Sequence, residues 1–176
     1  MSEVLNAIAK RSSTRGYTEQ KLTKEEVEQL VIAGLQAPTA ANKQEIHITV
    51  VDGGNPILKE LEELKNECMG LTNPQNNFYC GAPTVFILSA DASFYWSKVD
   101  AGIAVENIAI AAEAMGLGSL IIGCIKDPLY GDKKEYFAKV LRFPEGYEFQ
   151  VAIALGHKAV SKEQHEFEVD RQVTYL

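Results

Sequence analysis

The sequence has few cysteines and no spacing that would pair them or bind a metal with them. Cys68, Cys80 and Cys124 are its three cysteines, and no CxxC occurs. An odd number cannot pair fully within one chain, and the missing CxxC argues against a zinc knuckle and a thioredoxin-like redox pair. We therefore expect reduced thiols in a cytoplasmic protein, with Cys124 as a buried thiol.

Long apolar runs and an excess of positive charge are also missing. Glu3 stands where a signal peptide would need apolar residues, and polar residues interrupt the most apolar long segment, 103–115. We expect neither a signal peptide nor a membrane-spanning helix.

The 24 acidic residues outnumber the 17 basic ones, for a formal net charge of −7. This balance argues against nucleic acid or an anionic membrane as the main partner.

Three familiar catalytic or nucleotide-binding signatures are absent. There is no P-loop and no HExxH, and the three histidines are scattered, so we expect no metal site. Gly116 and Gly118 are followed by Gly123 rather than by a glycine at the dinucleotide-binding spacing, and they follow a predicted helix instead of a strand. A Rossmann fingerprint is therefore not indicated.

The patterns that are present predict one α+β domain over residues 1–176, with a sheet covered on both faces. N-caps predict helices that begin after Ser2, Thr23 and Asn55, the second ending at Pro38. Further helices are predicted over 99–115, which is rich in small residues, and over 131–141; strands are predicted over 46–51, 84–89, 119–125 and 149–155. The tail, 157–176, is polar with isolated apolar residues, so it is either disordered or packs on another surface, such as a partner subunit.

Three segments carry residues that suit a ligand. The turn 11–15 holds two arginines and three hydroxyls, which suit a phosphate or carboxylate; the alternative is a solvated helix end with arginines near its carboxyl terminus. The turn 38–44 combines small residues with Asn42 and Gln44, which can bond to the edge of a heterocycle, or it is an ordinary connection. Glycines flank the apolar strand in 116–123, which suits a flat ligand or a plain core strand.

Taken together, these segments resemble the nitroreductase family of FMN enzymes, nearly throughout the chain and in the same order. The matching residues are Arg11, Ser13 and Arg15; Pro38, Thr39, Asn42 and Gln44; Asp100, Gly102, Ala104 and Asn107 before Gly-Leu-Gly; Gly146-Tyr147; 151–156; and Arg171 near the carboxyl end.

The resemblance implies a site for FMN that is built from separate segments. Arg11, Ser12 and Ser13 would hold the phosphate and ribityl chain, and Arg15 would lie near the pyrimidine, where positive charge favours the anionic reduced flavin. The residues of the second turn would line the ring and ribityl chain: Pro38, Thr39, Ala40, Asn42 and Gln44. Backbone at Ile122 and Gly123 would approach N5, Arg171 would return to the phosphate, and His157 is a weaker contact.

The implied fold is a three-layer α/β/α arrangement with a mixed, mostly antiparallel sheet, in an obligate homodimer. Two departures from the family pattern stand out. The family commonly continues Gln-Pro-Trp, whereas this chain has Gln44-Glu45-Ile46. The chain is also short, so a lid over the pocket is expected to be reduced to the loop 72–81.

The implied activity is hydride transfer from NADH or NADPH, through FMN, to nitroaromatic, quinone or similar acceptors. No side chain needs to act as a nucleophile, because the cofactor carries the chemistry. Two alternatives stay open: a specialised reductive dehalogenase or dehydrogenase, and a non-catalytic flavin-binding interaction protein. The sequence names neither the physiological acceptor nor the preferred nicotinamide.

Overall fold

The computed structural model describes residues 2–71, 77–163 and 166–176. At its centre is a four-stranded sheet in the order β1-β2-β4-β3, in which neighbouring strands are antiparallel. The strands are β1 (His47–Asp52), β2 (Thr84–Asp91), β3 (Leu117–Ile122) and β4 (Tyr147–His157). The α+β fold with a mostly antiparallel sheet is confirmed. Among the described residues, the mixed character is limited to a parallel bridge between Ser13 and Ser119.

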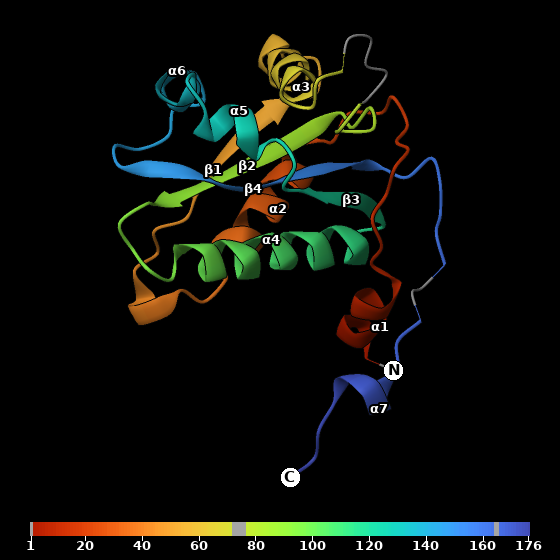
Figure 1. The fold of residues 1–176 in the computed structure, drawn as a ribbon. Helices are drawn as coiled ribbons and strands as arrows, with labels where there is room; N and C mark the ends of the chain where they lie inside the picture. Colours follow the sequence, from red (N-terminus) through yellow and green to blue (C-terminus); the bar gives the residue numbers. More distant parts are fainter. Residues whose placement is uncertain (1, 72–76, 164–165) are drawn as a thin grey trace.

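Helices cover both faces of the sheet and give three layers (Figure 1). One face carries α3 (Pro56–Cys68), α5 (Lys126–Tyr130) and α6 (Lys134–Val140), and the other carries α2 (Lys24–Leu35) and α4 (Ser97–Ala114). Because both faces are covered, β2 is buried almost from end to end, with alternate residues entering opposite cores. The remaining elements are α1 (Glu3–Lys10), the short 3₁₀ turn η1 (Ala40–Asn42) and α7 (Val169–Gln172).

The helix starts follow from local sequence, as predicted. Ser2 accepts a hydrogen bond from the backbone N–H of Leu5 at the start of α1. Thr23 and Glu26 form a reciprocal capping box at the start of α2. Asn55 caps α3 through the backbone N–H of Ile57, with proline at the first helical position.

Helix α4 is the central helix that its small residues predicted. Its alanines at 101, 104, 109 and 112 are buried against the sheet and against α2. The contact with α2 is close, because a Cβ on Gly34 would lie 2.8 Å from Cδ1 of Ile108. Within the described ranges, no helix combines the length and apolar character needed to traverse a bilayer.

Several predicted boundaries were wrong. Helix α2 ends at Leu35, with Gln36 as its C-cap, so the helix stops before the residue that precedes Pro38. The strand predicted over 119–125 instead spans Leu117–Ile122, because the chain turns at Gly123 and enters α5, which the sequence pattern missed. The helix predicted from Gly131 begins at Lys134. Cys124 lies in the turn before α5 and is exposed, so the expectation of a buried thiol was also wrong.

The carboxyl-terminal segment leaves the domain as an arm. It is anchored by a bridge between Tyr17 and Lys158 and by a 3.0 Å hydrogen bond from the backbone N–H of Ala159 to the carbonyl of Gly16. Beyond this point the arm extends past α1 and away from the sheet, ending beyond α7 (Figure 1). Its apolar residues lack a core of their own: the exposed fraction is 71% for Phe167 and 86% for Tyr175.

The described part of the loop 72–81, the expected lid, packs beside α3, and its role as a lid stays a prediction. Residues 72–76 lie outside the described residues. In the remainder, the backbone N–H of Phe78 donates to Glu62 on α3 at 2.7 Å, and Tyr79 is buried. This part lines a separate pocket beside α3.

Candidate functional site

The first predicted turn, 11–15, lies between α1 and the start of β3. Thr14 is buried, and its backbone N–H donates to the carbonyl of Ser119 at 2.8 Å. Nε of Arg11 lies 3.4 Å from Oε1 of Glu106 on α4. The β3 backbone comes so close that a Cβ on Gly118 would lie 2.8 Å from the Thr14 side chain. Glycine at 118 therefore permits the contact that fixes this turn.

The polar side chains of this first turn are available to a ligand. Ser12 and Ser13 are half-buried and Arg15 is exposed. Within the described chain, the hydroxyls of Ser12 and Ser13 make no hydrogen bond, and Arg15 makes no ion pair. Hydroxyls and a guanidinium without protein partners are the donors that a phosphate ester accepts from.

The second predicted turn, 38–44, is a strained backbone segment held by its own side chains. Ala41, Asn42 and Gln44 have left-handed φ values of 55°, 52° and 52°. Oγ1 of Thr39 accepts from the backbone N–H of Gln44 at 2.9 Å, and Oδ1 of Asn42 accepts from Nε2 of Gln44 at 3.1 Å. Such a conformation persists only where its surroundings fix it.

Helix α4 supplies that fixation. The backbone N–H of Ala40 donates to Oδ2 of Asp100, in the first turn of α4, at 2.9 Å. Lys43 reaches the end of β2, with Nζ 3.6 Å from Oδ2 of Asp91 and 4.2 Å from the centre of the Phe94 ring. The second turn is thus attached to the amino-terminal end of α4.

The third predicted segment, 116–123, leaves space for a flat ligand. Ile122 ends β3 and is buried, and Gly123 follows it directly. Gly123 is exposed, and a Cβ built there would meet nothing within 4 Å. The absence of a side chain at Gly123 therefore leaves open space against backbone, as a ring edge would require.

The structure does not bring the first two turns together within one chain. The first turn lies beside β3 and contacts α4 through Arg11 and Glu106, whereas the second turn is attached to α4 at Asp100, near its amino-terminal end. Asp100 and Glu106 are six residues apart, about 9 Å along the helix and about 240° around it, so the two turns contact different sides of α4. That all the segments meet at one ligand stays a prediction.

Two further predicted contacts also lie apart from these turns. Arg171 is on α7 in the arm, exposed, with Nε 3.6 Å from Oε2 of Glu168. His157 ends β4, and its Nε2 lies 3.9 Å from Oε1 of Glu26 on α2. Within the described residues, neither forms a hydrogen bond or an ion pair with the first turn.

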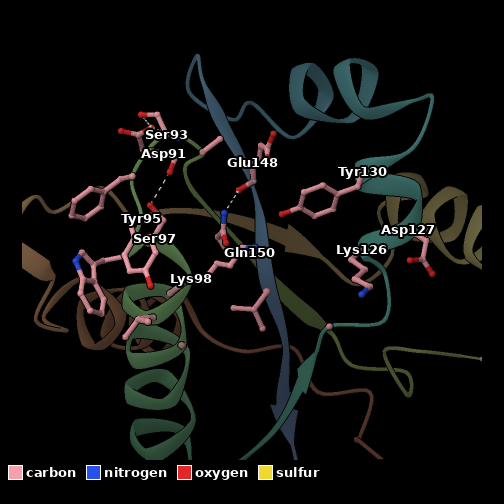
Figure 2. Close-up of a pocket in the computed structure, with 18 of the residues that line it drawn as sticks. Asp91, Ser93, Tyr95, Ser97, Lys98, Lys126, Asp127, Tyr130, Glu148 and Gln150 are labelled. Atoms are coloured by element: carbon pink, nitrogen blue, oxygen red, sulfur yellow. Dashed lines mark hydrogen bonds between the residues drawn. The ribbon is translucent and has the colours of Figure 1, made fainter.

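A cleft of about 1380 Å³ lies between α4 and α5, with β4 as its floor (Figure 2). Of the predicted site residues, only Gly123 lines it. Tyr95 and Trp96 are at its rim before α4, with ring centroids 5.1 Å apart in an edge-to-face arrangement. From α5, Tyr130 donates to the carbonyl of Phe149 at 2.5 Å. No periodic pattern or motif in the sequence pointed to these aromatic residues.

The charges of the cleft are asymmetric. Each acid that lines it is paired with a lysine from outside: Asp91 with Lys43, Asp127 with Lys65, and Glu148 with Lys134. The lysines that line it, Lys98 and Lys126, make no ion pair within the described chain.

The pKa shifts agree with this pairing. The hydrogen bond from Lys65 is the main cause that lowers the pKa of Asp127. The hydrogen bond to Glu148 is the main cause that raises the pKa of Lys134. Each acid of the cleft thus has a lysine partner, whereas Lys98 and Lys126 have none in the described chain, in a protein of net charge −7.

Glu45, the departure noted in the sequence, is buried rather than facing a ligand. Its exposed fraction is 5%, and neither carboxyl oxygen has a hydrogen-bond partner in the described chain. Burial is the main cause that raises its pKa, and Asp100 adds to the shift. The sequence showed the anomaly at this position, and the structure shows where the side chain goes.

Comparison with known proteins identifies the class of this fold and site. The model of the nitroreductase family matches residues 8–157. The chain therefore belongs to the nitroreductase family.

Individual relatives agree with this assignment. A Bacillus subtilis protein named FMN reductase (NADPH) is 30% identical over 172 residues, covering 90% of this chain and 67% of the relative. A nitroreductase from Desulfitobacterium hafniense, solved with bound FMN, superimposes with a TM-score of 0.90 at 29% identity, covering 100% of this chain and 99% of that one. An FMN-dependent nitroreductase from Clostridium difficile gives 0.81 at 29% identity, covering 98% and 96%.

Proposed function

We propose that this chain is an FMN-dependent oxidoreductase that transfers hydride from NADH or NADPH to nitroaromatic, quinone or similar organic acceptors. The observation that carries the proposal is the open backbone at Gly123, in line along β3 with the unpaired polar side chains of the first turn. Two solved relatives that share this fold are named as a nitroreductase with bound FMN and an FMN-dependent nitroreductase.

The residues along β3 fit the two ends of such a cofactor. Arg11, Ser12 and Ser13 would bind the phosphate and ribityl chain, and the exposed cation Arg15 would lie near the pyrimidine. Ile122 and Gly123 would present backbone to the ring edge. Bound FMN would supply the two-electron chemistry, while the protein orients the ring and excludes water from one face.

The same proposal requires two copies of the chain. Because the first and second turns contact different sides of α4, at Glu106 and at Asp100, a second copy would supply Pro38, Thr39, Ala40, Asn42 and Gln44 to the first copy's cofactor. Apolar side chains of α1 support this homodimer, with exposed fractions of 63% for Val4, 54% for Leu5 and 48% for Ile8.

The arm also fits a homodimer. We propose that residues 1–176 form one domain whose tail, 157–176, packs on the second copy and carries Arg171 to its phosphate site. Docking would stabilise this exposed segment, because it would bury apolar surface of residues such as Phe167 and Tyr175.

The nicotinamide and the acceptor would use the cleft beside Gly123 in turn. Its aromatic rim suits a planar ring, and the unpaired Lys98 and Lys126 favour substrates that carry an anionic group. The cleft also borders Gly102, on the exposed side of α4, so a second copy packed there would close one side of it.

Anaerobic reduction tests the proposal directly. Purified protein loaded with FMN should be bleached by NADH or NADPH, and the colour should return on addition of a nitroaromatic or quinone. A panel that includes halogenated aromatics separates a general reductase from a specialised one. A protein that stays colourless and fails to bind added FMN would contradict the assignment of both cofactor and activity.

A further inference from the structure

Glu45 is a buried acid. It follows the second turn directly, and only 5% of its surface is exposed. Both carboxyl oxygens lack a hydrogen-bond partner in the described chain. A buried, unpaired carboxylate is strongly disfavoured, so the group needs either a donor or a proton.

The group that faces Glu45 is a second acid, Asp100. It is also buried, at 3% exposed, and its carboxyl lies within hydrogen-bonding reach of that of Glu45. One oxygen of Asp100 already accepts the backbone N–H of Ala40. Two ionised carboxylates can only accept, whereas a proton on either one makes it a donor to the other.

Positive charge does not offset this pair. Asp100 from α4 and Lys43 from the same segment are the charged groups that act on Glu45. Lys43 is directed elsewhere, with Nζ 3.6 Å from Asp91 and above the ring of Phe94. Burial and the neighbouring acid outweigh it, and the pKa of Glu45 is raised.

We propose that Glu45 and Asp100 share one proton, and that this acid pair positions the second turn for cofactor binding. The inference rests on the proposed function, because the turn is expected to contact FMN. The shared proton keeps Asp100 facing Ala40, and that contact holds the left-handed backbone at 41–44. Loss of the proton places two negative charges side by side and loosens the turn.

The direction of the pH effect follows from the raised pKa. Glu45 is neutral when the turn is in place and ionises at lower pH when the turn is detached. The attached turn is therefore most stable at pH values below the ordinary glutamate pKa, and it loses stability as pH rises from there to the raised pKa. The cofactor is expected to dissociate more readily over the same interval.

Titration of FMN onto the apoprotein from about pH 5 to about pH 9 tests the coupling. In the wild type, Kd should rise with pH, with a slope of at most about one decade per pH unit, the limit for one coupled proton. Glu45→Gln should remove this slope and keep the low-pH affinity within about threefold, because the amide supplies Asp100 with a donor at every pH. Glu45→Ala supplies none and should bind weakly at low pH too.

A control separates this effect from a general loss of charge. Glu145 is exposed and makes no ion pair within the described chain, so Glu145→Gln should keep the wild-type slope. Equal slopes for the wild type and Glu45→Gln would overturn the proposal.

A second measurement does not depend on the cofactor. Carbon-13 NMR of glutamate carboxyls in the apoprotein, with Glu45 assigned by its absence in Glu45→Gln, reports the titration itself. A Glu45 carboxyl that is still neutral at pH values above the ordinary glutamate pKa supports the acid pair. This holds even if no FMN binds, a result that would contradict the proposed function alone. A Glu45 that ionises in the ordinary range would overturn the pair.

Discussion

Gly118 on β3 and Thr14 in the first turn are so close that a Cβ on the glycine would lie 2.8 Å from both Cγ2 and Oγ1 of the threonine. Gly118→Ala should therefore push the turn away from β3. Overpacking of this kind costs about 1–3 kcal/mol, and FMN affinity should fall with it because the same turn carries Ser12 and Ser13. Urea unfolding and FMN titration measure the two effects.

A double-mutant cycle identifies the cause of the Gly118→Ala effect. Thr14→Ala removes both close atoms, so Gly118→Ala should cost clearly less in that background. An equal cost in both backgrounds would show that the strain arises elsewhere, for example at Lys158, whose Cγ is 3.0 Å away.

Arg11 tests the phosphate end of the proposed site. Its guanidinium pairs with Glu106 at 3.4 Å and is mostly shielded, with 22% of the side chain exposed. Arg11→Ala should weaken FMN binding by about 1.5–3 kcal/mol, as expected for a charge-assisted hydrogen bond. Equilibrium dialysis measures the change, and Lys139→Ala, which removes a positive charge on α6, is the matched control. Unchanged retention would refute the phosphate assignment.

The unpaired lysines of the cleft predict a preference among acceptors. Lys126→Ala and Lys98→Ala should each lower kcat/KM about two- to fivefold for an acceptor with a carboxylate, such as 4-nitrobenzoate, because a partly exposed ion pair contributes little more. Rates with the neutral 4-nitrobenzamide should stay nearly unchanged. Equal losses for both acceptors would indicate a structural effect rather than charge recognition.

A pH-dependent contribution to stability is expected from the pair that joins α3 to α5. Lys65 lowers the pKa of Asp127, so this acid stabilises the fold above the ordinary aspartate pKa. The contribution is lost as pH falls from there through the lowered pKa. The difference in Tm between the wild type and Asp127→Asn should therefore shrink on acidification. A difference that is constant with pH would exclude the ion pair as its source.

Local signals in the sequence predicted much of the fold. Caps at Ser2, Thr23 and Asn55 act within one helical turn, so they could be recognised without knowledge of the tertiary structure. Helix α5 has only five residues and contains Pro128, which leaves no periodicity to detect. Its cleft residues, including Lys126, were therefore missed.

The arrangement of the site depended on information that the sequence does not carry locally. Motifs indicated which residues suit a ligand, but the placement of the two turns is set by where each contacts α4, at Glu106 and at Asp100. The orientation of Glu45 depends on Asp100, which is 55 positions away in the chain and is brought close by folding. Such long-range pairs have no signature in one sequence.

The separation of the two turns leads to a complementation experiment. Arg11→Ala and Asn42→Ala should each impair FMN binding, because each removes one half of the proposed site. In a mixed dimer, one site would combine both substitutions, while the other would combine the intact Arg11 of one copy with the intact Asn42 of its partner. Co-refolding the two variants should therefore restore FMN binding to about half of the sites in mixed dimers.

The complementation result depends on geometry alone. If a single chain formed the whole site, each copy in the mixture would keep its own defect, and co-refolding would restore nothing. Gel filtration supplies the accompanying control: a chain shortened after Lys158 lacks the arm and should dissociate more readily than the full chain, because the exposed apolar residues Phe167 and Tyr175 are lost from the contact. A wild-type protein that is monomeric and still retains FMN would contradict the shared site, whatever the behaviour of the variants.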